Sequence, residues 1–414
     1  MKHILATIAL GSVALTGCAT SSPPRPKTYD RFTVGDSYLS DFYLLNKATP
    51  ADPGKLLRRE KLGKTQSLEQ AGTNVRLLYS STDGLTGSGT VPVSGVLFLP
   101  KGTPPKGGWP LMAWTHGTVG IADICAPSWN GRQAQDEEYL NRFLARGYAV
   151  VASDYQGLGT KGTHPYLHTR AAAYSNLDII RAVQGAGFPV SDRIVLFGQS
   201  QGAGAAIATA DYAPDYAPEL KLVGVVATGA PYFTPAALDA LDRIRKPDDV
   251  DPMLGYTFLA MTLEQQLDPA FTMRDYLTDK AWPIARRVDD TCYAEIRQMV
   301  TEASLSRSSS FARDPAAGLR PAFAAMGYPH LKLSAPLFFG TGGQDKDTPP
   351  RMQAALVMAL CRAGTRVQSR LYPELDHRGV VLPSLADSMP FVEAAFAGEE
   401  TPGNCDNLPF RGLQ

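Results

Sequence analysis

The sequence predicts an α/β fold with a mostly parallel central sheet, flanked by helices and carrying an inserted helical cap. Two observations predict this fold class. Apolar runs of strand length alternate with helical segments over much of the chain, and this alternation stops between residues 232 and 330. Parallel strands covered by helices on both faces read as continuous apolar runs.

Residues 73–99 predict an antiparallel opening, because β-branched and apolar residues alternate there with Gly, Ser, Thr and Asp turns. The later apolar runs predict strands buried on both faces. They are residues 111–115, 148–153, 194–197, 222–228, 337–340 and 367–372. We assign residues 31–231 and 331–414 to the two parts of the core. Residues 232–330 become the cap, since structureless loops of that length are rare.

Composition bounds the function. The chain has 414 residues, 44% hydrophobic and 19% charged, which is typical of a globular protein and not of a disordered one. Its 40 Lys and Arg balance 40 Asp and Glu, and no run of like charges stands out. We therefore expect no nucleic-acid partner.

The N-terminus predicts export. Residues 1–17 have a short polar head and an apolar stretch too short to span a bilayer, as in a signal peptide. Leu15-Thr16-Gly17-Cys18 resembles the lipobox of bacterial lipoproteins, which implies that Cys18 is lipidated and anchors the protein to a membrane. Residues 18–30 then form a tether, and Ala19 after the cysteine favours the outer membrane under the usual sorting pattern.

Four further cysteines, Cys125, Cys292, Cys361 and Cys405, suit an oxidising compartment. No pair has the spacing of a zinc or redox motif, so we predict disulfides and no metal site. Connectivity is not readable from sequence. We expect Cys125 with Cys292, joining an early loop to the cap, and Cys361 with Cys405, joining the C-terminal tail to the last helix.

The strongest motif is Gly198-Gln199-Ser200-Gln201-Gly202, which follows an apolar strand and precedes an Ala-rich helix. This is the context of a nucleophile elbow. The turn is so tight that side chains two positions either side of Ser200 would clash. The serine hydroxyl projects beside a helix N-terminus, which favours developing negative charge.

Serine needs a base, and in such folds the order along the chain is Ser, acid, His. His377 lies just beyond the last predicted strand, whereas His330 precedes the strand whose end should supply the acid. The loop after residues 337–340 offers Asp345 and Asp347 as the acid. Asp376, adjacent to the histidine in sequence, is poorly placed to reach its ring.

The oxyanion of a tetrahedral intermediate needs main-chain N–H donors. One is expected from Gln201, which follows the nucleophile, and a second from Thr118, with Gly117 as the alternative, in the loop after residues 111–115. We expect His116 to orient its neighbours at most and to take no part in the chemistry. Residues 157–162 match the G-x-G-x-x-G dinucleotide pattern, but His164-Pro165 follows in place of a helix, so no nucleotide cofactor is expected.

In order and spacing, these pieces resemble the secretory lipase family of α/β-hydrolases. The matching segments are residues 115–118, 125–128, 154–159, 164–167 and 198–202, with the Asp345 and His377 loops. The resemblance implies ester hydrolysis, an α/β-hydrolase fold with a helical lid, and a triad of Ser200, Asp345 and His377. The resemblance favours Asp345 over Asp347 as the acid of the triad, because the family's acid precedes a Val-Pro or Thr-Pro pair by three residues. Asp345 precedes Thr348-Pro349 by the same distance. The lipidated N-terminus departs from the family pattern.

We therefore predict a serine ester hydrolase that needs no cofactor and acts on a small-molecule or lipid ester. Peptidase or acyltransferase chemistry on the same triad is the alternative, because the triad does not select the leaving group. The second alternative is a lipoprotein that binds a ligand and has no catalytic activity. Residues 253–261, with Phe258 and Met261, are expected to form the acyl wall, or else only to hold the cap together.

Overall fold

A computed structural model describes residues 34–45, 48–238 and 246–411; the predicted signal peptide, Cys18 and the tether lie outside them. The strands are β1 (Leu56–Lys61), β2 (Ala71–Thr82), β3 (Thr90–Pro100), β4 (Trp109–Thr115), β5 (Ala149–Ser153), β6 (Val190–Gln199), β7 (Lys221–Thr228), β8 (Leu337–Gly342) and β9 (Val367–Tyr372). The helices flanking them are α1 (Pro127–Asn130), α2 (Ala134–Leu144), α3 (Thr169–Gly185), α4 (Gln201–Tyr216), α11 (Pro350–Arg362) and α12 (Leu385–Ala397).

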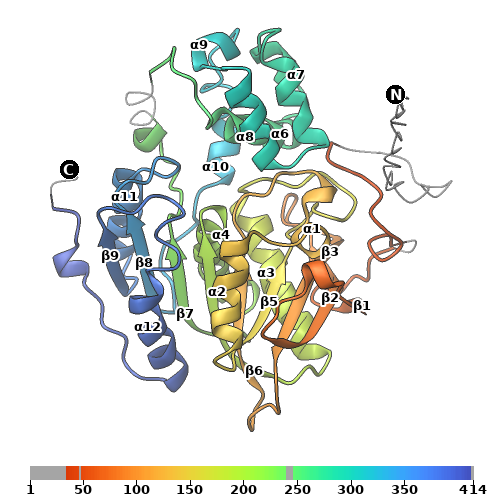
Figure 1. The fold of residues 1–414 in the computed structure, drawn as a ribbon, viewed down its shortest axis with the longest axis vertical. Coiled ribbons are helices and arrows are strands. Elements are labelled where there is room, and N and C mark those ends of the chain that lie inside the picture. Colours follow the sequence, from red (N-terminus) through yellow and green to blue (C-terminus); the bar gives the residue numbers. More distant parts are fainter. Residues whose placement is uncertain (1–33, 46–47, 239–245, 412–414) are drawn as a thin grey trace, which may run out of the picture. The chain divides into compact units, whose positions relative to one another are not determined.

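All nine strands form one sheet, in the order β1-β2-β3-β5-β4-β6-β7-β8-β9 (Figure 1). The pairs β1-β2, β2-β3 and β3-β5 are antiparallel, and all later pairs in this order are parallel. The predicted antiparallel opening and parallel remainder are therefore confirmed. Strand β1 was not predicted; its sequence Leu-Leu-Arg-Arg-Glu-Lys has only two apolar residues, as befits an exposed edge strand.

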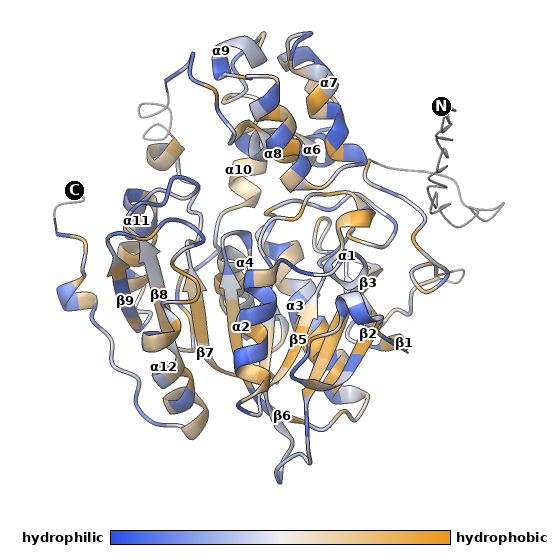
Figure 2. Cartoon of the chain, viewed as in Figure 1, coloured by the Kyte–Doolittle hydropathy of each residue, from blue (hydrophilic) through white to orange (hydrophobic). Residues whose placement is uncertain are grey.

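Strands β3 to β8 are buried on both faces of the sheet, which explains their apolar runs (Figure 2). Along β4, Leu111 and Ala113 pack into a core with α3, α4 and α11. Their neighbours Met112 and Trp114 pack into the opposite core, with α2 and α12. Successive side chains of a strand point to opposite faces, so burying both faces requires an unbroken apolar run.

Between β7 and β8, residues 232–330 contain only helices among their described residues, plus isolated bridges. They are α6 (Leu254–Leu267), η3 (Met273–Tyr276), α7 (Trp282–Ala285), η4 (Arg286–Asp289), α8 (Tyr293–Glu302), α9 (Arg307–Ser310) and α10 (Arg320–Ala325). We call residues 232–330 the helical segment. Its apolar residues form a cluster of their own, joined by Ile121 and Tyr166 from the core. No helix in the described part of the chain has the length and apolarity needed to cross a membrane.

Candidate active site

Ser200 lies at the turn from β6 into α4, with φ 59° and ψ −125°. Positive φ is costly for a residue other than glycine and persists where the surroundings enforce it. The two flanking glycines show that enforcement. A Cβ on Gly198 would lie 2.1 Å from the carbonyl oxygen of Gly202, and a Cβ on Gly202 would lie 2.0 Å from that of Thr115. Only glycine fits either position, as the sequence indicated.

The predicted base and acid lie in direct contact. His377, in the loop after β9, donates from Nδ1 to Oδ2 of Asp345, in the loop after β8, at 2.7 Å. Both residues are buried. The other oxygen of Asp345, Oδ1, accepts main-chain N–H bonds from Asp347 at 2.9 Å and Thr348 at 2.8 Å. These donors hold the carboxyl group in place, and Oδ2 as the acceptor fixes the tautomer of the imidazole with its proton on Nδ1.

Three residues that were not predicted as members of the site surround this pair. The Thr348 hydroxyl lies 2.9 Å from Asp345 Oδ2 and 3.0 Å from the carbonyl oxygen of Gly229. Gln353 donates from Nε2 to the same Oδ2 at 2.9 Å. A Cβ on Gly229 would lie 3.1 Å from Nδ1 of His377, so this glycine lets the main chain after β7 pass beside the ring. Only Thr348 had a signal, the Thr-Pro pair.

The second ring nitrogen, His377 Nε2, is buried and makes no hydrogen bond within the described part of the chain. Ser200 and His377 line the same cleft, of about 620 Å³. A buried polar atom without a partner requires an explanation, and a nitrogen that receives a proton during a reaction is one. Asp376 does not reach the ring: its Oδ1 accepts from the main chain of Arg378 and Gly379. His330 instead pairs with Asp215, at 3.3 Å.

On the oxyanion side, Gln201 is the first residue of α4, so its main-chain N–H has no acceptor within the helix. Thr118 follows β4, and it lines the cleft and an apolar cavity together with Ser200. The hydroxyl of Thr115, at the end of β4, lies 2.7 Å from the carbonyl oxygen of Gly202 and so connects the end of β4 to the first turn of α4. The residues predicted to supply the donors therefore line the same apolar cavity as Ser200.

Two histidines near these loops are buried, and burial disfavours their charged form. Burial lowers the pKa of His116, whose ring nitrogens lie 2.8 Å and 3.2 Å from the carbonyl oxygens of Gly117 and Asp154. Burial also lowers the pKa of His164, to about 4. His116 contacts the loop of Thr118 without reaching the nucleophile, which fits the orienting role that the sequence predicted.

Ser200 lies at the boundary of two compartments. One is an apolar cavity of about 140 Å³ between the sheet and the helical segment. Its wall includes Met253, Ala260, Leu319, Phe323, Met326 and Met352. The other is the 620 Å³ cleft, lined by polar and charged residues that include Arg297, Lys346, Asp347, Asp376 and Arg378. Such a division suits a molecule with one apolar and one polar half.

The predicted acyl wall needs a correction. Met253, Tyr256, Thr257 and Ala260 line the apolar cavity, whereas Phe258 and Met261 are fully buried in the cluster of the helical segment. Helix α6 is apolar nearly all round, so periodicity could not tell its cavity face from its packed face.

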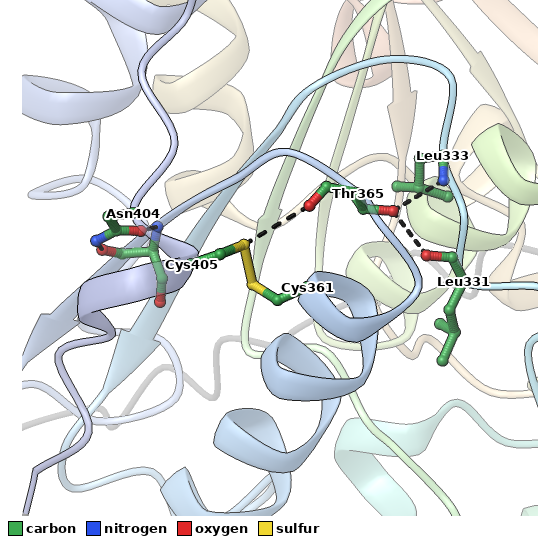
Figure 3. Close-up of a disulfide and its surroundings, with 7 residues drawn as sticks. Leu331, Leu333, Cys361, Thr365, Asn404 and Cys405 are labelled. Carbon is green, nitrogen blue, oxygen red and sulfur yellow. Dashed lines mark hydrogen bonds between the residues drawn. A yellow bond between two sulfur atoms is a disulfide. The ribbon is translucent and has the colours of Figure 1, made fainter.

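Both cysteine pairs that we expected are disulfides in the structure. Cys125 and Cys292 join η2 (Asp123–Cys125) to the start of α8, with Cα atoms 5.5 Å apart. Cys361 and Cys405 join α11 to η5 (Cys405–Asn407), with Cα atoms 5.6 Å apart. Beside the second bond, the Thr365 hydroxyl bonds the main chain of Leu331 and Leu333, where the chain returns to the core (Figure 3).

Residues 157–162 form a loop, and α3 does not begin until Thr169, so no helix N-terminus follows the glycine pattern. Among the described residues, no group of three or more His, Cys, Asp or Glu side chains has an arrangement that could hold a metal ion.

Comparisons with known proteins find similarity to one family. Residues 128–246 match the model of the family described as secretory lipase. The chain is similar to the secretory lipases. Lipase A of Arthroderma benhamiae is 28% identical over 249 residues, which are 53% of this chain and 50% of that protein. The matched family segment includes Ser200 and ends before Asp345 and His377.

Solved structures show the fold. Lipase A of Candida antarctica in its closed state matches with a TM-score of 0.71 and 20% identity, over 89% of this chain and 88% of that one. The rice cell wall degrading esterase LipA of Xanthomonas oryzae matches with a TM-score of 0.66 and 20% identity, over 85% and 100%. The predicted α/β-hydrolase fold is confirmed, and the comparisons point to a lipase or esterase.

Proposed function

We propose that the chain is a serine carboxylic ester hydrolase with the triad Ser200, His377 and Asp345. The observation that carries the proposal is the bond of 2.7 Å between His377 Nδ1 and Asp345 Oδ2, with Nε2 unpaired among the described residues and the strained Ser200 lining the same cleft. A buried carboxylate, an oriented imidazole and a half-buried elbow serine together make an activated nucleophile.

The reaction follows from these positions. Ser200 Oγ attacks the acyl carbon while its proton passes to His377 Nε2, and Asp345 stabilises the imidazolium that forms. The N–H groups of Gln201 and Thr118 bind the oxyanion. Collapse expels the alcohol, which takes the proton from Nε2. Water, deprotonated by the same nitrogen, then releases the acid and restores Ser200.

The two compartments divide the substrate. The acyl chain occupies the apolar cavity, and the leaving alcohol lies in the polar cleft. The helical segment then acts as the cap, because it supplies Met253 and Ala260 to the acyl wall. This arrangement favours an ester over a peptide, since the wall of the acyl cavity is mostly apolar and offers a peptide main chain few hydrogen-bond partners.

A series of p-nitrophenyl esters of increasing chain length, with peptide arylamides beside it, tests the proposal. Ester hydrolysis and fluorophosphonate labelling of Ser200 are expected. Ser200→Ala should abolish labelling and lower kcat by roughly four to six orders of magnitude. The exposed loop residue Ser88 serves as a control, since Ser88→Ala should change neither. Faster cleavage of the arylamides would favour a peptidase, and an unlabelled, inactive wild type would favour a binding protein.

We also propose that the protein is exported and anchored through a lipid on Cys18, in the outer membrane. The lipobox pattern supports the anchor, and the two disulfides, which need an oxidising compartment, support export. Cys18→Ala should move the protein from the membrane to the soluble fraction and abolish labelling by a fatty-acid analogue. A variant that stays with the membrane would refute the anchor without affecting the proposed chemistry.

A further inference from the structure

We propose that residues 164–166, which we call the HPY segment, position both residues of the oxyanion hole at once. His164 contacts Gln201, and Tyr166 contacts Thr118. This inference rests on the proposed function, because it assigns those two residues to oxyanion binding.

The contact of Tyr166 is with the side chain of Thr118. The two hydroxyl oxygens lie 2.8 Å apart, and Tyr166 is only 2% exposed. Threonine is branched at Cβ, so fixing Oγ1 fixes the first side-chain torsion angle and restrains the adjacent main chain. The hydrogen bond therefore holds the N–H of Thr118 in one orientation.

The contact of His164 fixes Gln201 from the other side of the site. His164 Nδ1 lies 2.9 Å from the carbonyl oxygen of Gln156, and Nε2 lies 3.2 Å from Nε2 of Gln201. A carbonyl oxygen can only accept, so the ring proton lies on Nδ1 and the neutral ring accepts from the Gln201 amide. The lowered pKa of His164 agrees with a neutral ring. Gln201 is thereby restrained at the first residue of α4.

The HPY segment is itself held firmly, as a positioning element must be. Tyr155 stacks with the ring of His164, with centroids 5.8 Å apart and planes 11° apart. Leu167, the next residue along the chain, has φ 60°, a conformation that a leucine adopts only under constraint. Gln266 of α6 donates to the main-chain carbonyl of His164 at 3.4 Å. Strain of this kind concentrates at functional sites.

The Tyr166 ring packs in the cluster of the helical segment, with Leu254 and Phe258 of α6. The HPY segment therefore connects the helical segment to both oxyanion residues. Plain packing would need the ring of Tyr166, but it would not need a hydroxyl aimed at Thr118. This difference can be tested.

Each variant in the test removes one functional group. Tyr166→Phe and Thr118→Val each delete one hydroxyl of the pair and keep its shape. Each should lower kcat about ten- to a hundredfold with little change in KM, because the bond serves the transition state. The double variant should be no worse than either single variant, since both remove the same bond. Thr118→Ser, which keeps the hydroxyl, should restore most of the activity.

Inhibitor binding separates positioning from folding. A trifluoromethyl ketone, which forms a tetrahedral adduct with the serine, should bind Tyr166→Phe more weakly by the same factor as the loss in kcat. A non-hydrolysable ether analogue of the substrate should bind it as it binds the wild type. Tyr79→Phe is the matched control, because Tyr79 shares a buried hydroxyl pair with Ser153, at 2.7 Å, within the sheet. It should leave kcat per fluorophosphonate-labelled site unchanged.

His164→Phe and Gln201→Leu test the other contact in the same way and are expected to be non-additive with each other. Additive losses in both double variants would overturn the proposal, as would an unchanged kcat per labelled site in Tyr166→Phe. If Tyr166→Phe does not fold, Thr118→Val carries the same test from the other partner. Failure of the proposed function is distinct, since the wild type itself would then not be labelled.

Discussion

Gln199, which precedes Ser200 in the elbow, donates from its side-chain amide to the main-chain carbonyl of His377, at 3.0 Å. This hydrogen bond joins the elbow to the loop that carries the predicted base. Neither the glycines of the elbow nor the apolar pattern of the strands indicates it. Because Gln199 is only 7% exposed, the bond is shielded from water and is not readily replaced by it.

Gln199→Ala should therefore lower kcat about tenfold, because the main chain that carries the imidazole loses one of the bonds that hold it in place. Steady-state kinetics per labelled Ser200 measure this. Gln66 makes the same kind of bond, to the carbonyl oxygen of Trp129 at 2.7 Å, outside the two compartments of the site. Gln66→Ala should leave kcat unchanged. Equal effects of the two variants would contradict an orienting role for Gln199.

The sequence could predict the features that are local. These features can be recognised from neighbouring residues in the chain. They are six apolar runs, the two glycines that flank the elbow serine, and a histidine after the last strand. Three residues of the site, Gly229, Gln353 and Gln199, act through contacts that the local sequence does not indicate. Tyr166 belonged to a motif that the resemblance contained, but its bond to Thr118 required coordinates.

Ala260 should control acyl chain length, because it lines the apolar cavity and has little volume of its own. Ala260→Leu would fill part of a 140 Å³ space, so esters with long acyl chains should lose about tenfold in kcat/KM relative to short ones. The p-nitrophenyl ester series measures the shift.

Phe258→Leu provides the comparison, since Phe258 packs within the cluster of the helical segment. It should lower the melting temperature and leave the chain-length profile in place. If Ala260→Leu leaves the profile unchanged while Phe258→Leu shifts it, the acyl chain does not occupy this cavity.

The charges of the cleft should favour leaving groups that carry a negative charge. Arg297, Lys346 and Arg378 outnumber Asp347 and Asp376 there, and Arg297 lies 3.6 Å from Asp347. Lys346→Gln and Arg378→Gln should each reduce kcat/KM for an ester with an anionic alcohol by about two- to fivefold at low salt.

An ester with the same acyl chain and a neutral alcohol should be hydrolysed by these variants as by the wild type. The difference should fade at high salt, because exposed charges are screened. Lys101→Gln, at an exposed position outside the cleft, controls for overall charge. No dependence on the charge of the alcohol would show that these side chains do not meet the leaving group.

The two disulfides should separate stability from activity. Their sequence separations, 167 and 44 residues, predict losses of roughly 5 and 4 kcal/mol when each is removed, on the loop-entropy model. Both double variants, Cys125→Ala with Cys292→Ala and Cys361→Ala with Cys405→Ala, should therefore melt at lower temperature by comparable amounts. Thermal unfolding by circular dichroism measures this.

Activity should distinguish the two pairs. The Cys125–Cys292 bond lies where Tyr293 donates its main-chain N–H to the carbonyl oxygen of Val119, at 2.8 Å, next to the predicted oxyanion residue Thr118. Losing it frees the helical segment from that loop, so kcat should fall at temperatures where the protein is still folded. The other pair joins α11 to the C-terminal tail, and its removal should leave kcat per labelled site unchanged. Equal losses of kcat in both variants at low temperature would mean that the first bond has no part in holding the oxyanion loop.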